Sequence, residues 1–159
     1  MEYAKIGTLT LTTFDKDNRE DLEFIKRMCQ DETIRSRFQG IMRGLSNEKK
    51  SFFDTGFLVK HDKDLIGYIH IGNFNELDHC VYLRSAVDKD KRGLSYGKTI
   101  LSEITEYIFQ NYPQVESIRL KIAIDNKPSL MTANSCGYLW LEDDFYIKYN
   151  PYMDLKKTK

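Results

Sequence analysis

The sequence predicts an α+β domain in which a sheet carries helices on its faces. At 159 residues the chain is long enough for one compact core. Apolar residues recur with strand and helix periods in a mixed order: strand, two helices, three strands, helix, strand, helix and two strands. Neither a repeat nor a low-complexity linker divides the sequence, so we expect residues 1–159 to form a single domain.

The first part of the chain is predicted to form one strand and one long helix. Residues 6–14 alternate between apolar and polar side chains, which is typical of a strand. Asp17 and Asn18 then provide a polar cap region, and acids in the next turn precede apolar residues at helical spacing. Residues 32–45 are ambiguous.

A shorter helix is predicted over residues 46–56. Ser46 or Asn47 would cap its start, and Gly56 would end it.

The remaining segments are predicted to complete the sheet and cover it. A helix is expected over 95–111, ended by Pro113, and a second over 127–136, followed by Gly137. Short apolar runs separated by polar turns predict strands at 57–61, 65–72, 80–87, 117–124, 138–141 and 145–149.

Composition and charge restrict the class of partner. The 24 basic and 24 acidic side chains balance, so no overall field favours nucleic acid or an anionic membrane. The start of the chain lacks a leader pattern, and no apolar run reaches the roughly 20 residues of a membrane span. Three widely spaced cysteines suit neither disulfides nor a metal site. We expect a soluble cytoplasmic protein without a bound metal.

The segment "KDKRGLSYGKTI", residues 89–100, joins a predicted strand to the long predicted helix. A helix start offers amides without partners and a partial positive charge, and Gly93 and Gly97 leave room for an anion to approach them. Cationic side chains add to that charge at Lys89, Lys91, Arg92 and Lys98. The segment predicts a pyrophosphate site, with an ordinary strand-to-helix turn as the alternative.

Two common phosphate motifs do not fit this segment. Gly93-x-x-x-Gly97-Lys98-Thr99 is one residue short of a P-loop, and the glycine pattern of a dinucleotide fold is missing. Instead, Arg92-Gly93-x-Ser95-x-Gly97 resembles the acetyl-CoA loop of the GNAT superfamily, Arg/Gln-x-x-Gly-x-Gly/Ala. Ser95 stands where that motif has its middle glycine, and serine is a good N-cap.

A second motif extends the resemblance towards the end of the chain. Asn126 is followed after eleven residues by Gly137-Tyr138, and GNAT proteins place Gly-Phe at that spacing. The resemblance implies a mixed, mostly antiparallel central sheet with helices on both faces. Asn126-x-x-Ser129 is most similar to the branch that contains ribosomal-protein N-terminal acetyltransferases.

The resemblance implies an acyltransferase that uses acetyl-CoA as its cosubstrate. The acetyl group would pass by direct attack to a primary amine, on a peptide N-terminus, a lysine or a small amine, in a monomer or a homodimer. It implies cofactor contacts from Ala86, Val87, Arg92, Gly93, Leu94, Ser95, Tyr96, Gly97, Lys98, Asn126 and Ser129.

The groups that move protons are harder to assign. Many relatives carry a glutamate base on the strand before the loop, and the matching position is Tyr82, a weak base at pH 7. The alternatives are ordered water or one of three nearby side chains: Glu76, Asp78 and His79.

Protonation of the departing thiolate shows a similar gap. Many relatives place a tyrosine seven residues after the asparagine, where this chain has Ala133. Ser129 is the substitute that the ribosomal-protein branch suggests, and capping its helix is the alternative role. Because neither Tyr82 nor Ala133 is the residue that is usual at its position in the family, a CoA-binding regulatory or interaction domain remains the alternative function.

Overall fold

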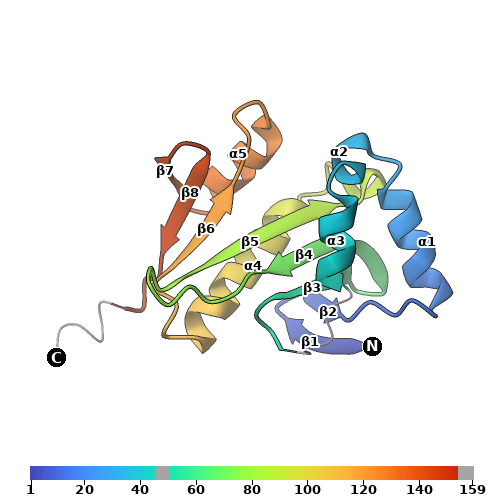
Figure 1. The fold of residues 1–159 in the computed structure, drawn as a ribbon, viewed down its shortest axis with the longest axis horizontal. Coiled ribbons are helices and arrows are strands. Elements are labelled where there is room, and N and C mark those ends of the chain that lie inside the picture. The colour runs from blue at the N-terminus through green and yellow to red at the C-terminus, as the bar shows by residue number, and fades with distance from the viewer. Residues whose placement is uncertain (46–50, 154–159) are drawn as a thin grey trace.

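The computed structural model describes residues 1–45 and 51–153, and they form an eight-stranded sheet (Figure 1). The strand order is β1-β2-β3-β4-β5-β6-β8-β7, and every neighbouring pair is antiparallel except β5 and β6. The predicted mixed, mostly antiparallel α+β sheet is confirmed. Its strands are β1 Glu2–Ile6, β2 Leu9–Thr12, β3 Thr55–His61, β4 Asp64–Ile71, β5 Cys80–Val87, β6 Ser117–Lys121, β7 Leu139–Glu142 and β8 Phe145–Tyr149.

Helices cover both faces of this sheet. Two of them follow the predicted pattern closely, because their apolar stripes face the core and their caps are local. The helices are α1 Arg19–Met28, α2 Glu32–Arg35, α3 Phe38–Leu45, α4 Tyr96–Asn111 and α5 Lys127–Ser135, with a 3-10 turn, η1, at Lys89–Lys91. Asn18 caps α1 by accepting a hydrogen bond from the amide of Asp21, as predicted for this segment.

The single strand predicted over residues 6–14 is wrong. The chain forms a hairpin instead, in which β1 and β2 pair with Ile6 opposite Leu9. Gly7 sits in the turn with φ +61°, a conformation that glycine adopts without strain. Gly7 and Thr8 form the turn between the two strands, although the apolar and polar residues of the sequence alternate across them as in one strand.

The helix predicted over 46–56 is also wrong in its described part. Residues 46–50 lie outside the described residues, and Thr55 and Gly56 already belong to β3. Gly56 does not end a helix; it lets α3 approach the sheet. A Cβ on Gly56 would lie 2.9 Å from the backbone carbonyl carbon of Gly44, so the two glycines permit direct backbone contact.

Two apolar clusters fill the space between the sheet and its helices. The larger one joins one sheet face to α4 and α5, with Phe57, Ile69 and Leu83 among its strand residues. The smaller one lies under α1 and α3 on the opposite face, where Leu58 and Tyr68 pack. Figure 1 shows α3 in front of the sheet and α4 behind it. The alternation of strand side chains therefore assigns each residue of β5 to one of two compartments.

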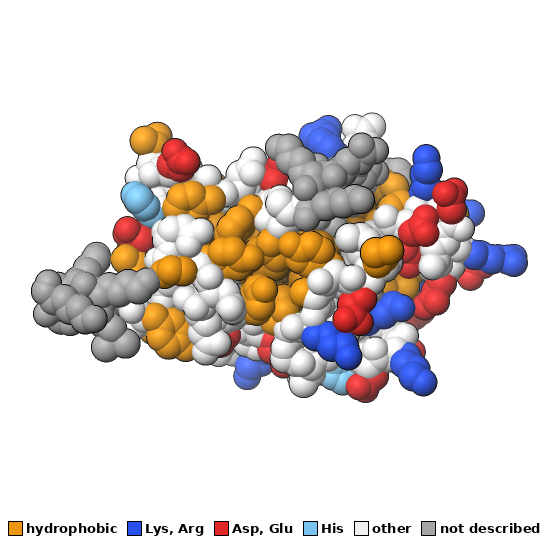
Figure 2. All heavy atoms as spheres, turned by 90° about the horizontal axis from the view of Figure 1, so that it is seen from below, with side chains coloured by type: hydrophobic (Ala, Val, Ile, Leu, Met, Phe, Trp, Pro, Cys, Tyr) orange, Lys and Arg blue, Asp and Glu red, His pale blue; other side chains and the backbone are white. Residues whose placement is uncertain are grey.

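Several further features of the described residues bear on the predictions. Cys80 and Cys136 are buried and Cys29 is half-buried, and burial raises the pKa of all three thiols. None of the described helices is long and apolar enough to cross a bilayer, and no metal-binding group of three side chains occurs among the described residues. Figure 2 shows hydrophobic side chains gathered across the face seen from below.

Candidate active site

Strands β5 and β6 run parallel, and they part after only three paired positions. Cys80 to Tyr82 pair with Ser117 to Arg119, after which β6 continues along β8 while β5 continues along β4. Figure 1 shows the two strands leaving the same end of the sheet and diverging. The second half of β5 therefore has one edge that is not paired to a neighbouring strand.

The register of β4 and β5 determines which backbone groups face this opening. The Asp88 amide donates to the Ile66 carbonyl, and the Tyr82 carbonyl accepts from the Gly72 amide. Even-numbered residues of β5 therefore bond to β4, and the amides and carbonyls of Ser85 and Val87 point away from it. The expectation for Val87 agrees with this geometry. The expectation for the backbone of Ala86 does not, because Ala86 is paired with β4, and Ser85 takes its place.

A buried ion pair anchors the loop that follows β5. The Asp88 side chain is 0% exposed, and its Oδ2 lies 2.8 Å from Nη2 and 3.0 Å from Nε of Arg27 on α1. Asp88 also begins η1 by accepting from the amide of Asp90 at 3.4 Å. A carboxylate without contact to water requires such a partner. The pair therefore ties the start of the loop to α1, which packs on the same face of the sheet as α3.

The end of the same loop presents main-chain amides. Gly93 has φ +82°, and Ser95, at the N-cap of α4, has φ +62°. No side chain among the described residues caps α4, so the Ser95 hydroxyl does not have the capping role that its residue type suggested. A Cβ on Gly97 would meet only Val87 Cγ2, at 3.7 Å. Uncapped amides next to open space fit an anionic group such as a pyrophosphate.

The cations of the loop differ in their surroundings. Arg92 is ion-paired with Asp31, the N-cap of α2, so its guanidinium is held towards the helix pair rather than left free in the loop. Burial opposes the charge of Asp31, but hydrogen bonds from Arg92 and the Thr33 amide, with the charges of Arg92 and Lys89, together outweigh it and lower the pKa of Asp31. Lys98, in the first turn of α4, is exposed. Leu94, also expected at the cofactor, is 60% exposed, which leaves it available for contact.

The second motif forms the start of α5. The Asn126 side chain caps this helix by accepting from the Ser129 amide at 3.3 Å. Ser129 is half-buried in the first turn, with its hydroxyl available for another partner. Ala133 is 0% exposed in the larger core cluster, so a tyrosine there would require repacking. Tyr138 is buried, and its hydroxyl lies 2.6 Å from that of Thr105.

The predicted proton acceptors lie at the closed end of the strand pair. Glu76 and Asp78 are exposed in the loop before β5, and His79 follows them with φ +51° and its Nδ1 3.9 Å from Glu116 Oε2. His79 is three residues from Tyr82, after which the two strands part. Of the three, Asp78 lies nearest Tyr82's neighbour Arg119, with its Oδ2 3.8 Å from Nη1 of that arginine.

Tyr82 lies where the strands part. Its ring packs edge-on against Phe145 with the ring centres 6.0 Å apart. Burial disfavours the charge of Arg119, but a hydrogen bond with the Tyr82 side chain and the nearby Cys80, Tyr82 and Asp78 groups together outweigh it and raise the pKa of Arg119. Nε of Arg119 is buried with no hydrogen-bond partner among the described residues. Tyr82 is thus held in the mouth of the opening, beside a cation.

His70 on β4 is a candidate that the sequence reasoning missed. It is paired with Arg84 in the register and is half-buried beneath α3, where a Cβ on Gly44 would meet its Cδ2 at 3.0 Å. Burial, reinforced by the Arg84 charge, lowers the pKa of His70, so its imidazole is neutral at pH 7. Its position two residues from Tyr68, on the same strand face, was readable from the alternation, but its pairing with Arg84 was not.

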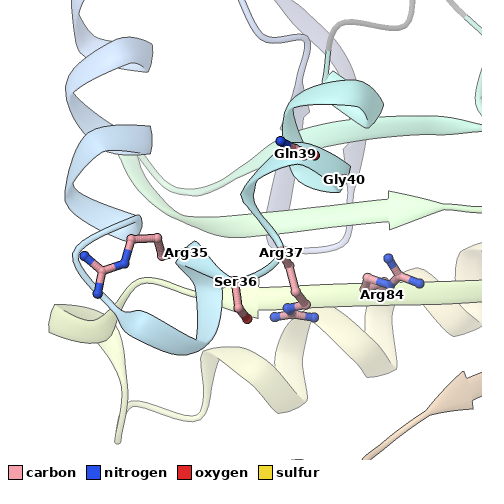
Figure 3. A pocket seen from close by; sticks show the side chains of 6 residues that line it. All are labelled: Arg35, Ser36, Arg37, Gln39, Gly40 and Arg84. Atoms are coloured by element: carbon pink, nitrogen blue, oxygen red, sulfur yellow. The ribbon is translucent and has the colours of Figure 1, made fainter.

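A hollow on the α3 side of β5 is the second feature that the sequence reasoning missed. Its volume is about 450 Å³. Figure 3 shows residues from the end of α2, the following linker, the first turn of α3, and β5 around it. The lining residues are Arg35, Ser36, Arg37, Gln39, Gly40 and Arg84. It lies across the sheet from α4, so it approaches the opening from the face opposite that helix.

Solved acetyltransferases share this fold. A chimera of the Vibrio cholerae spermidine N-acetyltransferase SpeG and hSSAT matches with a TM-score of 0.71 at 15% identity, covering 96% of this chain and 100% of that chain. RimL, a ribosomal L7/L12 alpha-N-protein acetyltransferase solved with coenzyme A, matches with a TM-score of 0.66 at 13% identity, covering 94% and 98%. At these identities the likeness shows the fold alone.

A third solved structure contains the whole cosubstrate. The microcin C7 self-immunity acetyltransferase MccE, in complex with acetyl-CoA and AMP, matches with a TM-score of 0.65 at 14% identity, covering 90% of this chain and 93% of that chain.

No curated protein matches the sequence. Residues 7–138 match the family model of the acetyltransferase (GNAT) family. This match spans most of the chain, and it shows that the protein belongs to the acetyltransferase (GNAT) family.

Proposed function

We propose that this chain is an N-acetyltransferase that moves an acetyl group from acetyl-CoA to a primary amine. The observation that carries the proposal is the set of uncapped amides at the start of α4, next to the opening between β5 and β6. Family membership supports acetyl-CoA as the cosubstrate. When bound, it supplies an activated acetyl thioester that a neutral amine attacks directly.

Main-chain groups would do most of the binding. The amides of Ser95, Tyr96, Gly97 and Lys98 would hold the pyrophosphate, with the open space at Gly93 and Gly97 allowing close approach. The backbone of Ser85 and Val87 would pair with the pantetheine arm as a neighbouring strand does. An amide of the same edge would stabilise the negative charge that develops on the acetyl oxygen.

The acceptor amine must lose a proton before it attacks. A lysine side chain is neutral in only about one molecule in 2,500 at pH 7. Tyr82 lies where the strands part, and His70, whose lowered pKa leaves it neutral, lies one strand away on β4, opposite Arg84. We favour His70 as the acceptor of this proton, directly or through water. Glu76, Asp78 and His79 are the less favoured candidates, because they are exposed in the segment before β5.

The departing thiolate needs a proton in turn. Ser129 is the candidate donor, since it lies in the first turn of α5 and its amide, not its hydroxyl, is used by the Asn126 cap. The absence of a tyrosine at the buried Ala133 position is the observation that keeps the alternative of a CoA-binding regulatory domain. Turnover with any amine would exclude that alternative.

A pair of substitutions at Gly97 tests the cofactor site. Gly97→Glu places a carboxylate at the amides of α4, and Gly97→Gln has nearly the same size without the charge. Both side chains have room, because a Cβ here meets only Val87 Cγ2 at 3.7 Å. A carboxylate in the first turn also favours the helix, so the fold is retained.

Isothermal titration calorimetry with coenzyme A is the measurement. We expect binding by the wild type, weaker binding by Gly97→Gln, and no detectable heat from Gly97→Glu. Equal affinity in the two variants would contradict an anion site at these amides. Release of free CoA in the presence of a panel of amines then separates the enzyme from a binding domain.

A further inference from the structure

Arginines concentrate in the hollow on the α3 side of β5. Three of its six described lining residues carry guanidinium groups, and the other three are Ser36, Gln39 and Gly40. The volume of about 450 Å³ is in the range of pockets that bind small molecules. A hollow with this lining has donors for several hydrogen bonds and a local positive charge, although the whole chain is neutral.

Arg37 is a half-buried cation whose guanidinium does not have a hydrogen-bond acceptor for each of its donors among the described residues. Its Nε is buried and has no hydrogen-bond partner among the described residues. Burial, and then the neighbouring charge of Arg84, lower the pKa of Arg37, against a weaker opposing effect of Asp31. The Asp31 carboxylate is itself ion-paired with Arg92. Leaving a buried charged donor without an acceptor is unfavourable, and an oxyanion in the hollow would supply the acceptor.

Arg84 connects the hollow to the opening between the strands. It precedes Ser85, whose backbone faces that opening, and its own side chain lies on the α3 face. Figure 3 shows the Arg37 and Arg84 side chains along the same stretch of β5. Burial raises the pKa of Tyr68 to about 12 and lowers that of His70, so the groups packed next to Arg84 on β4 are neutral. The charge of Asp54 also acts on His70.

Arg35 is in a different position from the other two arginines. Its Nη2 lies 3.8 Å from Glu32 Oε1 one turn earlier, and its side chain is mostly exposed. Arg37 and Arg84, by contrast, form no ion pair among the described residues, and Arg84 lies on the strand whose other edge faces the opening.

We infer that the acceptor is a small primary amine that also carries an oxyanion, a carboxylate or a phosphate monoester, and that Arg37 and Arg84 bind this oxyanion. Guanidinium groups form paired, charge-assisted hydrogen bonds with both kinds of oxyanion. A polycationic acceptor would be repelled by the same arginines, so this chain differs from the spermidine acetyltransferases that share its fold. This inference rests on the proposed function.

Matched acceptor pairs test the inference. Amino acids are compared with their amides, 2-aminoethyl phosphate is compared with ethanolamine, and spermidine serves as the polycation. A carboxylate makes the neighbouring amine more basic than an amide does, so intrinsic reactivity favours the amide at neutral pH. We expect the opposite order here, with kcat/KM at least about tenfold higher for an oxyanion-bearing amine. The carboxylate and phosphate arms distinguish the two sources of the oxyanion.

Three variants locate the effect. Arg37→Gln and Arg84→Gln should raise the KM for the preferred acceptor about tenfold or more, with the KM for acetyl-CoA unchanged. Arg84→Lys should restore part of the loss because it keeps the charge without the paired geometry. Arg19→Gln is the matched control, since Arg19 is 91% exposed on α1 and pairs with Glu23 on the same helix.

A binding measurement makes the inference independent of turnover. Inorganic phosphate, against sodium chloride at equal ionic strength, should raise the thermal midpoint of the wild type more than that of the Arg37→Gln, Arg84→Gln double variant. Suppose that coenzyme A binds and acetyl is transferred, but that oxyanion-bearing amines are not preferred and the variants do not change the KM for the acceptor. This result overturns the inference and leaves the proposed function intact. Failure of coenzyme A to bind overturns the proposed function, and an equal phosphate effect in both proteins then overturns this inference too.

Discussion

Replacing Ser95 with glycine should make the protein more stable and leave its cofactor site intact. Ser95 holds φ +62° at the start of α4, and its hydroxyl makes no capping hydrogen bond. A residue with a Cβ is strained in this region of the backbone map, and glycine is not. Since the cosubstrate is proposed to contact main-chain amides here, the loss of the side chain removes nothing that binds it.

The size of the effect follows from two opposing contributions. Relief of left-handed strain contributes about 1–2 kcal/mol, and the greater freedom of glycine in the unfolded chain takes back about 0.4–1 kcal/mol. The free energy of unfolding should therefore rise by about 0.5–1 kcal/mol, and the thermal midpoint by about 1–4 °C for a chain of this length.

Ser102→Gly is the control within the same helix. Ser102 is exposed in the body of α4, so glycine there should lower the free energy of unfolding by about 0.5 kcal/mol. Urea denaturation followed by circular dichroism measures both variants, and calorimetry compares their affinity for coenzyme A. A loss of stability in Ser95→Gly as large as in Ser102→Gly would refute the reasoning that the left-handed turn is strained.

Two further predictions concern the ion pairs that hold the loop. Arg27→Met should lower the free energy of unfolding by about 3–5 kcal/mol, because it leaves the fully buried Asp88 carboxylate unpaired. Urea denaturation should show a smaller loss for Asp88→Asn, since Arg27 is 44% exposed and can reach water. Asp31→Asn removes a carboxylate whose pKa is lowered in the folded state, so its stabilising effect is present above the unfolded pKa of about 3.9. The stability difference between wild type and Asp31→Asn should therefore stay constant from pH 7 to 5 and shrink as the pH falls below about 4; a difference that grows on acidification would contradict the pairing with Arg92.

Much of the sheet and its main helix could be predicted because their signals are local. The strand at 80–87 and the helix at 95–111 have clear periodicity, and both were placed within a residue of their observed bounds. Helix α3 was not predicted. Its sequence contains Gly40 and Gly44, which lower helix propensity, and Gly44 is there because α3 contacts Gly56 across the core.

Part of the candidate site could likewise be predicted from the sequence, and part could not. The loop with its glycines and uncapped amides could be identified from adjacent residues. The choice of Ser85 over Ala86 required the register with β4, which alternation within β5 does not reveal. The arginine hollow joins Arg37 and Arg84, which lie far apart in the sequence, and no pattern in either segment connects them.

The order of the last strands has a consequence for synthesis on the ribosome. Strand β8 inserts between β6 and β7, although it follows both along the chain. Until Phe145–Tyr149 has emerged, β6 has only its three-residue pairing with β5 and an otherwise open edge. An open apolar edge on a nascent chain can recruit a strand from a neighbour. Emergence of β8, rather than the pairing of the early strands, thus ends the period in which this sheet is exposed to misassembly.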